Sequence, residues 1–92
     1  MTRPELLSLL KIDLGIVGDA YDPQLDQLLS AAEGMIAREG VALSASLEDA
    51  QLLLMYAAYL YRKRATDEGM PRMLRWALNN RLFSKGGGGG AP

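Results

Sequence analysis

Acidic side chains are the main candidates for chemistry in this chain of 92 residues, because the chain contains neither cysteine nor histidine. General acid or base catalysis needs a carboxylate held in a pocket that shifts its pKa. Asp22, Glu33 and Asp49 stand instead where helix caps or solvated helix faces are expected. The usual general base and thiolate chemistry are also missing. We therefore expect no enzyme activity and no cofactor.

Two further patterns resemble ligand sites only superficially. Asp19, Asp22 and Asp26 lie close in sequence, but they lack the EF-hand spacing and its glutamate at the twelfth position. The five glycines at 86–90 follow no strand and precede neither a helix nor a lysine, as a phosphate-binding loop would require. We expect neither a metal site nor a phosphate site.

The basic carboxyl-terminal third is a stronger candidate for binding. Arg72, Arg75 and Trp76 lie near one another on an expected helix, with Asn79 one turn beyond Arg75. Such a surface suits phosphates or the carboxylates of a partner protein. Equally, the arginines can simply solvate the exposed side while their aliphatic parts cover Trp76. The residues alone leave solvation, a protein partner and nucleic acid open.

Charge is unevenly distributed along the chain, although the net charge is only −1. Residues 1–61 hold three bases against nine acids, whereas residues 62–92 hold seven bases against two acids. This polarity suits an ordered assembly or a polyanionic partner. The start, MTRPELLSLLK, shows no basic region followed by an apolar core, so we expect no secretory signal and synthesis in the cytoplasm.

Local start and stop signals divide the chain into helices. Thr2 and Glu5 have capping-box spacing, and Gly15 suits a left-handed cap at the end of the first helix. Asp22 as N-cap with Pro23 at the first position opens a second, amphipathic helix, which Gly40 ends. Its interior Gly34 costs about 1 kcal/mol relative to alanine unless it permits close packing.

The third helix, at about 47–64, is the most apolar part of the chain. Ser46 and Asp49 give it a start resembling a capping box, and ten successive apolar or aromatic residues run from Leu52 to Tyr61. Ten residues rise only about 15 Å, half of a bilayer's hydrocarbon thickness, so we exclude a membrane span. Both faces of this helix need cover, either from the other helices or from a neighbouring copy.

A fourth helix starts at Pro71 and continues to about Phe83. Its expected buried residues are Met73, Leu74, Ala77, Leu78 and Leu82. From Ser84 onward the sequence is SKGGGGGAP, whose backbone entropy predicts a flexible tail. The expected fold is all-α: four helices in a small bundle around the long central apolar helix, in one domain at 1–83 with a glycine-rich tail at 84–92.

The second face of the central helix is the expected subunit interface, because tyrosine is enriched at protein interfaces. That face carries Leu52, Met55, Tyr56 and Tyr59. Side chains of this kind are more often plain core, but here they exceed what three short partner helices need to cover.

The blocks ELLSLLKIDLGI, DAYDPQLDQLLSAAEGMIAREG, DAQLLLMYAAYLYRKR and MPRMLRWALNNRLF cover most of residues 5–83. This register of helices and turns resembles the small head-to-tail connector (adaptor) proteins of long-tailed bacteriophages. The resemblance implies a structural protein of the virion neck, made in the cytoplasm of the host bacterium. It would form a dodecameric ring between the portal protein and the stopper or tail-completion protein, with DNA passing through the channel.

The resemblance also suggests roles for particular residues. Tyr56 and Tyr59 would pack between subunits, and the carboxyl-terminal segment would contact the portal. The residues in that segment are Arg72, Arg75, Trp76, Arg81, Phe83 and Lys85. The alternative is a small helical DNA-binding or regulatory module that uses the basic third, although the third helix is too apolar for recognition of DNA and the net charge is unsuited to tight binding.

Overall fold

Four helices and no strand make up the residues that the computed structural model describes, which are 2–66 and 69–90. The helices are α1 (Arg3–Leu14), α2 (Asp22–Arg38), α3 (Leu47–Thr66) and α4 (Arg72–Gly90). The prediction of an all-α chain with four helices is confirmed. Within the described ranges, every helix falls short of the length and hydropathy that a membrane span requires.

The predicted capping box at the start of α1 is present. Glu5 N donates to Thr2 Oγ1 at 3.3 Å, and Thr2 N donates to Glu5 Oε1 at 2.8 Å. At the other end, Gly15 adopts a left-handed φ of 72°, and its N–H donates to Ile12 O. At both ends of α1, free backbone groups are hydrogen-bonded by residues only a few positions away. This is why the sequence predicts both ends.

The start of α2 differs from the prediction, because Tyr21 and not Asp22 is the N-cap. Asp22 is the first residue of the helix, and its side chain does not cap the backbone. The carboxylate is taken by α1 instead, with Asp22 Oδ1 at 2.9 Å from Lys11 Nζ. A salt bridge between two helices thus replaces the expected local hydrogen bond. The predicted stop at Gly40 is close: α2 ends at Arg38, and Gly40 has a φ of 98°.

The prediction that the fourth helix ends near Phe83 is wrong, because the backbone of α4 continues to Gly90. Glycine has no steric barrier to helical dihedral angles, so nothing forbids the continuation, although each glycine costs about 1 kcal/mol relative to alanine. Ala91 and Pro92 lie outside the described residues. The flexibility of the tail stays a prediction.

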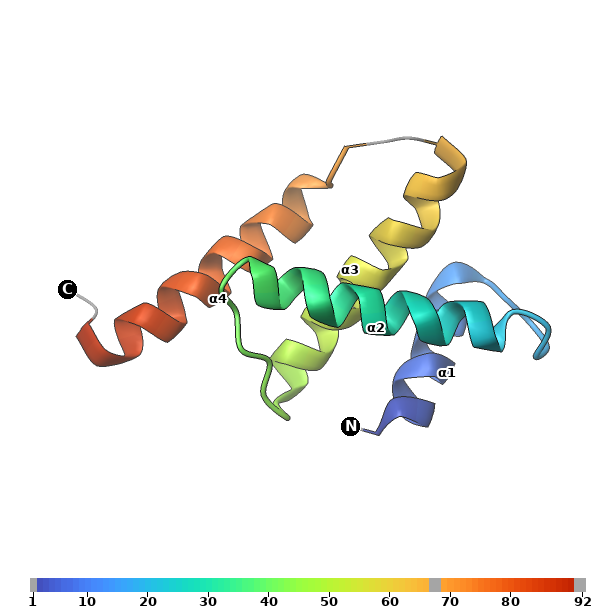
Figure 1. Ribbon diagram of the computed structural model, residues 1–92, viewed down its shortest axis with the longest axis horizontal. Helices are drawn as coiled ribbons and strands as arrows, with labels where there is room; N and C mark the ends of the chain where they lie inside the picture. The colour runs from blue at the N-terminus through green and yellow to red at the C-terminus, as the bar shows by residue number, and fades with distance from the viewer. Residues whose placement is uncertain (1, 67–68, 91–92) are drawn as a thin grey trace.

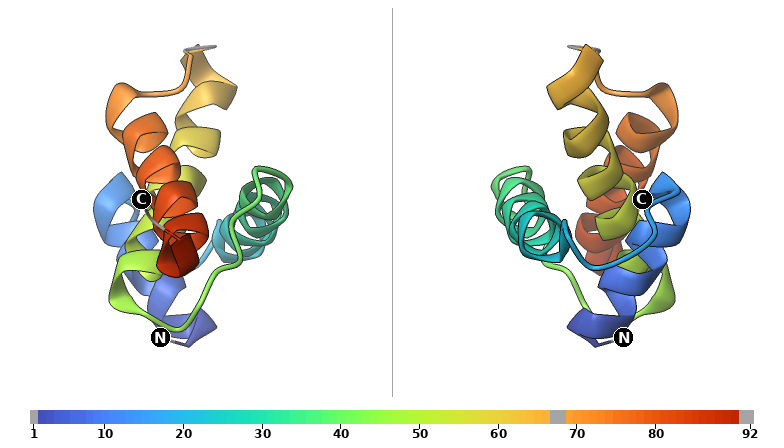
Figure 2. Two further views of the ribbon diagram at one scale, coloured as in Figure 1. Left: turned by 90° about the vertical axis from the view of Figure 1, so that its left-hand side faces the viewer. Right: turned by 90° about the vertical axis from the view of Figure 1, so that its right-hand side faces the viewer.

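Helix α3 contacts each of the other three helices. In Figure 1, α2 crosses in front of α3, with α1 and α4 to either side of it. The side views in Figure 2 set α2 apart on one side of the other three helices. The molecule is therefore a layer of α1, α3 and α4 with α2 laid across one face, and it measures 47 × 29 × 18 Å.

The core lies mainly where α2 meets that layer. Side chains from all four helices and from the segment after α2 are buried there: Leu6, Leu10, Leu25, Leu29, Ala32, Ile36, Val41, Ala50, Leu52, Leu53, Tyr56, Ala57, Ala58, Leu74 and Leu78. One face of the layer is thus covered by α2. The opposite face has no further helix of the described chain over it.

Candidate interaction surface

The four residues predicted as a subunit interface do not share one exposed surface. Leu52 and Tyr56 are buried within the single chain, at 3% and 5% exposure, whereas Met55 and Tyr59 are half-buried. Burial raises the pKa of Tyr56, and the nearby Glu39 carboxylate at the end of α2 adds to the effect. Tyr56 therefore belongs to the subunit's own core. Of the predicted residues, Met55 and Tyr59 remain available to a neighbour.

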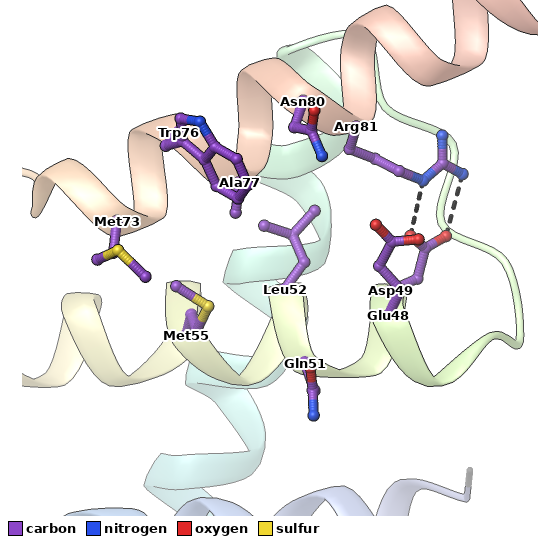
Figure 3. Close-up of a pocket in the computed structure, with 10 residues that line it drawn as sticks. All are labelled: Glu48, Asp49, Gln51, Leu52, Met55, Met73, Trp76, Ala77, Asn80 and Arg81. Atoms are coloured by element: carbon purple, nitrogen blue, oxygen red, sulfur yellow. Dashed lines mark hydrogen bonds and ion pairs between the residues drawn. The ribbon is translucent and has the colours of Figure 1, made fainter.

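The accessible face of α3 is rotated by about one residue from the predicted interface face, and it lies on the side of α3 opposite α2. There α3 forms the floor of a groove with α1 as one wall and α4 as the other. Three adjoining hollows of about 430, 220 and 210 Å³ make up this groove, and Met55 lines all three. Figure 3 shows one of them, with Met73 and Trp76 on α4 above Leu52 and Met55 on α3. None of the lining residues comes from α2.

Large apolar side chains project around this groove. Ile12 on α1 is 74% exposed, Leu47 at the start of α3 is 64% exposed, and Trp76 on α4 is 64% exposed. Met73 was predicted to be buried, but it is 69% exposed and lines the groove. Helix α4 buries Leu74 and Leu78 against the core, so Met73 is rotated toward the open face. We call this surface, formed by Leu9, Ile12, Leu47, Gln51, Met55, Met73 and Trp76, the open groove.

Three of the seven basic residues in the carboxyl-terminal third pair with acids from the first part of the chain. Arg75 Nη1 lies 3.4 Å from Glu39 Oε1, and Arg62 Nη2 lies 3.5 Å from Asp13 Oδ2. Arg81 Nε lies 2.7 Å from an oxygen of Asp49. Each pair joins residues more than thirty positions apart. The charge asymmetry along the sequence is therefore used within the fold, which leaves less positive charge for a polyanion than the sequence suggests.

Arg81, predicted as a portal contact, makes its observed contacts within its own subunit. Its guanidinium donates through Nε to Asp49 Oδ1 at 2.7 Å and through Nη2 to Asp49 Oδ2 at 3.0 Å. Nη2 also donates to Ala42 O at 2.9 Å. With these hydrogen bonds made, the Arg81 side chain is only 17% exposed. Figure 3 shows the two-pronged pair at the end of the groove.

Asp49 was expected at a helix cap, yet it is 1% exposed. Ser46 does cap α3, since Asp49 N donates to Ser46 Oγ at 3.1 Å. The Asp49 carboxylate, however, accepts from Ser44 N at 2.6 Å and from Ser44 Oγ at 2.9 Å. The hydrogen bond from Arg81, helped by those from Ser44, outweighs burial and lowers the pKa of Asp49 from 3.8 to about 2. The carboxylate is charged and fully engaged, so it is poorly suited to proton transfer.

The other predicted portal residues remain at the surface. Arg72 and Arg75 are exposed, as is Phe83 at 77%, while Trp76 lines the open groove. The side chain of Lys85 lies outside what the structure describes. Phe83 and Trp76 are seven residues apart on α4, which places them on one side of that helix.

Two aspartates near the start of α2, Asp19 and Asp22, form salt bridges with Lys11. Lys11 Nζ lies 3.3 Å from Asp19 Oδ1 and 2.9 Å from Asp22 Oδ1, and these carboxylates, Asp22 first, raise the pKa of Lys11. Among the described residues, no group of three acidic side chains is placed to hold a metal ion.

Sequence reasoning missed both the buried Asp49–Arg81 pair and the exposure of Met73. Local patterns carry no signal for either, because both depend on how α4 lies against α3. Comparison of the chain with protein-family models, with curated proteins and with solved structures finds no match.

Proposed function

We propose that this chain is a head-to-tail connector subunit of a long-tailed bacteriophage, a structural protein that forms a ring in the virion neck. In this proposal the ring joins the portal protein to the stopper or tail-completion protein, and DNA passes through its channel. The subunit is a small bundle around α3 as central helix, and the contact between subunits involves the open groove. The block pattern of the sequence supports the family, and the open groove supports the need for a protein partner.

The single observation that carries the proposal is the open groove. Ile12, Leu47, Met73 and Trp76 are all at least 64% exposed around one hollow surface. Single exposed apolar residues are normal, but a contiguous group of this kind around a groove is typical of a protein interface. The α3 residue at its centre, Met55, also belongs to the predicted interface.

The two predicted contacts can be assigned to different parts of α4. Trp76 lies in the open groove and so belongs with the contact between subunits. Phe83 lies two turns further along α4, and we propose it, with Lys85, for the portal. Arg81 is left out because its guanidinium is engaged by Asp49.

Purified protein, alone at high concentration and mixed with a phage portal protein, tests the proposal by sedimentation velocity and negative-stain microscopy. We expect closed rings in at least one condition. Ile12→Gln and Trp76→Gln should weaken ring formation because they place polar groups on the contact surface. Val17→Gln is the matched control, since Val17 is 96% exposed but lies outside the open groove. A strict monomer in both conditions would refute the proposal.

A further inference from the structure

The open groove has an unpaired acid at one end and an exposed base close to the other in sequence. Glu48 lines the groove where α3 begins, and the structure gives it no ion pair among the described residues. At the other end, Asp13 and Arg62 line the groove and pair with each other. Arg72 lies in sequence between the lining residues Pro71 and Met73, is exposed, and has no ion pair in the described ranges. Most other charges are already paired within the subunit. An occupant that fits this groove should therefore carry a positive charge near Glu48 and a negative charge near Arg72.

We infer that the outer face of α2 from a second copy of this chain occupies the open groove, running antiparallel to α3. In this arrangement Arg38 at the end of the copy's α2 meets Glu48, and the acidic start of that α2 approaches Arg72. The inference rests on the proposed function, because it names the contact through which the subunits would associate.

Length and charge both match in this orientation. From Asp26 to Arg38 along α2 is about 18 Å, and from Glu48 to Tyr59 along α3 is about 17 Å. Arg38 is exposed, and no ion pair to it is found among the described side chains. At the other end, Asp19 is 91% exposed and Asp26 is 52% exposed, even though Lys11 and Arg3 of the same subunit pair with them. The parallel orientation would instead bring Arg38 toward Arg72, which like-charge repulsion disfavours.

The outer face of α2 is also narrow enough to enter between the walls. Its exposed residues include Ser30, Ala31 and Gly34, and a Cβ placed at Gly34 would meet nothing within 4 Å. Gly34 therefore serves no packing purpose inside the subunit, although glycine weakens a helix. The walls of the groove carry projecting side chains, Ile12 on α1 and Trp76 on α4. A helix with small outward residues can lie between such projections and close to the floor of the groove.

The two surfaces lie on opposite faces of one molecule, so a subunit cannot satisfy its own groove. Figure 2 places α2 on one side of the layer, while the described residues that line the groove belong to α1, α3 and α4, with Pro71 just before α4. A contact between two different patches is heterologous, and repetition of it generates a closed ring or a filament. This contact is therefore of the type that a ring requires.

Charge exchange tests the contact directly. Arg38→Glu and Glu48→Arg should each weaken self-association in sedimentation velocity by about tenfold, because a rim attraction becomes a repulsion. A one-to-one mixture of the two variants should associate like the wild type, since every contact in an alternating assembly is again between opposite charges. The double variant Arg38→Glu/Glu48→Arg should also recover. Both residues are exposed, so the urea midpoint of each monomer should stay close to that of the wild type.

A steric variant gives an independent readout. Gly34→Gln fills the outer face of α2 without reducing helix propensity, and we expect it to weaken association at least tenfold while the protein stays folded by circular dichroism. If the wild type associates but Gly34→Gln and both charge variants associate equally well, the inference is wrong while the proposed function stands. Loss of association in Val17→Gln alone would also overturn it, in favour of the α1–α2 connection. A wild type that never associates refutes the proposed function itself.

Discussion

Replacing Arg81 by methionine should strongly destabilise this protein. The substitution keeps an unbranched apolar stem but removes the guanidinium, which leaves the carboxylate of Asp49, 1% exposed, without its cation. Two hydrogen bonds of 2.7 and 3.0 Å to that carboxylate are lost, along with the one from Arg81 to Ala42 O. Breaking a buried ion pair by removing one partner costs about 3 to 5 kcal/mol. Because Ser44 still donates twice to Asp49, we expect about 3 kcal/mol.

The pKa of Asp49 gives a second estimate of what its native contacts contribute. A shift from 3.8 to about 2 corresponds to about 2 kcal/mol of stability. Since the folded state holds the carboxylate deprotonated, this contribution is present above pH 4 and is lost as the pH falls toward 2. Asp49→Asn should remove that part of the acid dependence, because the amide does not titrate.

Urea unfolding of the wild type, Arg81→Met, Asp49→Asn and the double variant at pH 7 measures these effects, and repeating the series at pH 2.5 measures the acid dependence. The double variant should be more stable than Arg81→Met alone, because it no longer buries an unpaired charge. A loss below 1 kcal/mol in Arg81→Met, or a double variant less stable than Arg81→Met, would refute the argument that Arg81 neutralises a buried carboxylate.

Three changes at helix ends and glycines test the rest of the fold by urea unfolding. Gly34→Ala should raise the free energy of unfolding by about 0.5 to 1 kcal/mol, because the added methyl meets nothing within 4 Å and alanine favours the helix; a loss would contradict the exposed placement of Gly34. Gly40→Ala should cost about 1 to 3 kcal/mol, since φ is 98° and the new Cβ would lie 3.2 Å from Leu82 Cδ2; an unchanged midpoint would argue against that approach of α4. Thr2→Ala should cost about 1 kcal/mol through loss of the α1 cap, whereas Thr2→Ser should keep it.

The sequence predicts the ends of the helices best where one short segment contains everything that forms the end. The capping box at the start of α1 and the left-handed Gly15 at its end are of this kind. The predicted cap at Asp22 is wrong for the complementary reason. The backbone N–H groups at the start of α2 compete with Lys11 for the carboxylate of Asp22. Lys11 reaches that carboxylate from the preceding helix, and the salt bridge forms in place of the cap.

The candidate surface could be predicted only in part, because a helix that is apolar on all sides does not show which face its partners cover. On α3 the sequence identifies Met55 and Tyr56 alike as interface residues. Successive residues on a helix point about 100° apart, so α2 and α4 can bury Tyr56 while leaving Met55 on the open face. The exposure of Met73 follows in the same way from the rotation of α4 that buries Leu74.

Pairing within the subunit makes part of the basic third unavailable to a polyanion. The few charges that stay unpaired in the described part of the chain then indicate how a partner could be oriented. Arg62, Arg75 and Arg81 each pair with an acid from the first half of the chain, so the asymmetry in sequence becomes a set of contacts that fix α3 and α4 in place. After those pairs are made, Glu48 remains unpaired among the described residues in the lining of the apolar groove, and Arg72 remains unpaired beside Pro71 and Met73, which line its other end. A groove whose ends differ in charge orients its occupant, and an orienting contact is what distinguishes an ordered ring from nonspecific association through exposed apolar residues. If the subunits associate through the proposed contact, the association should respond to Arg38→Glu more strongly at low ionic strength than at high, while the loss caused by Gly34→Gln should persist at both.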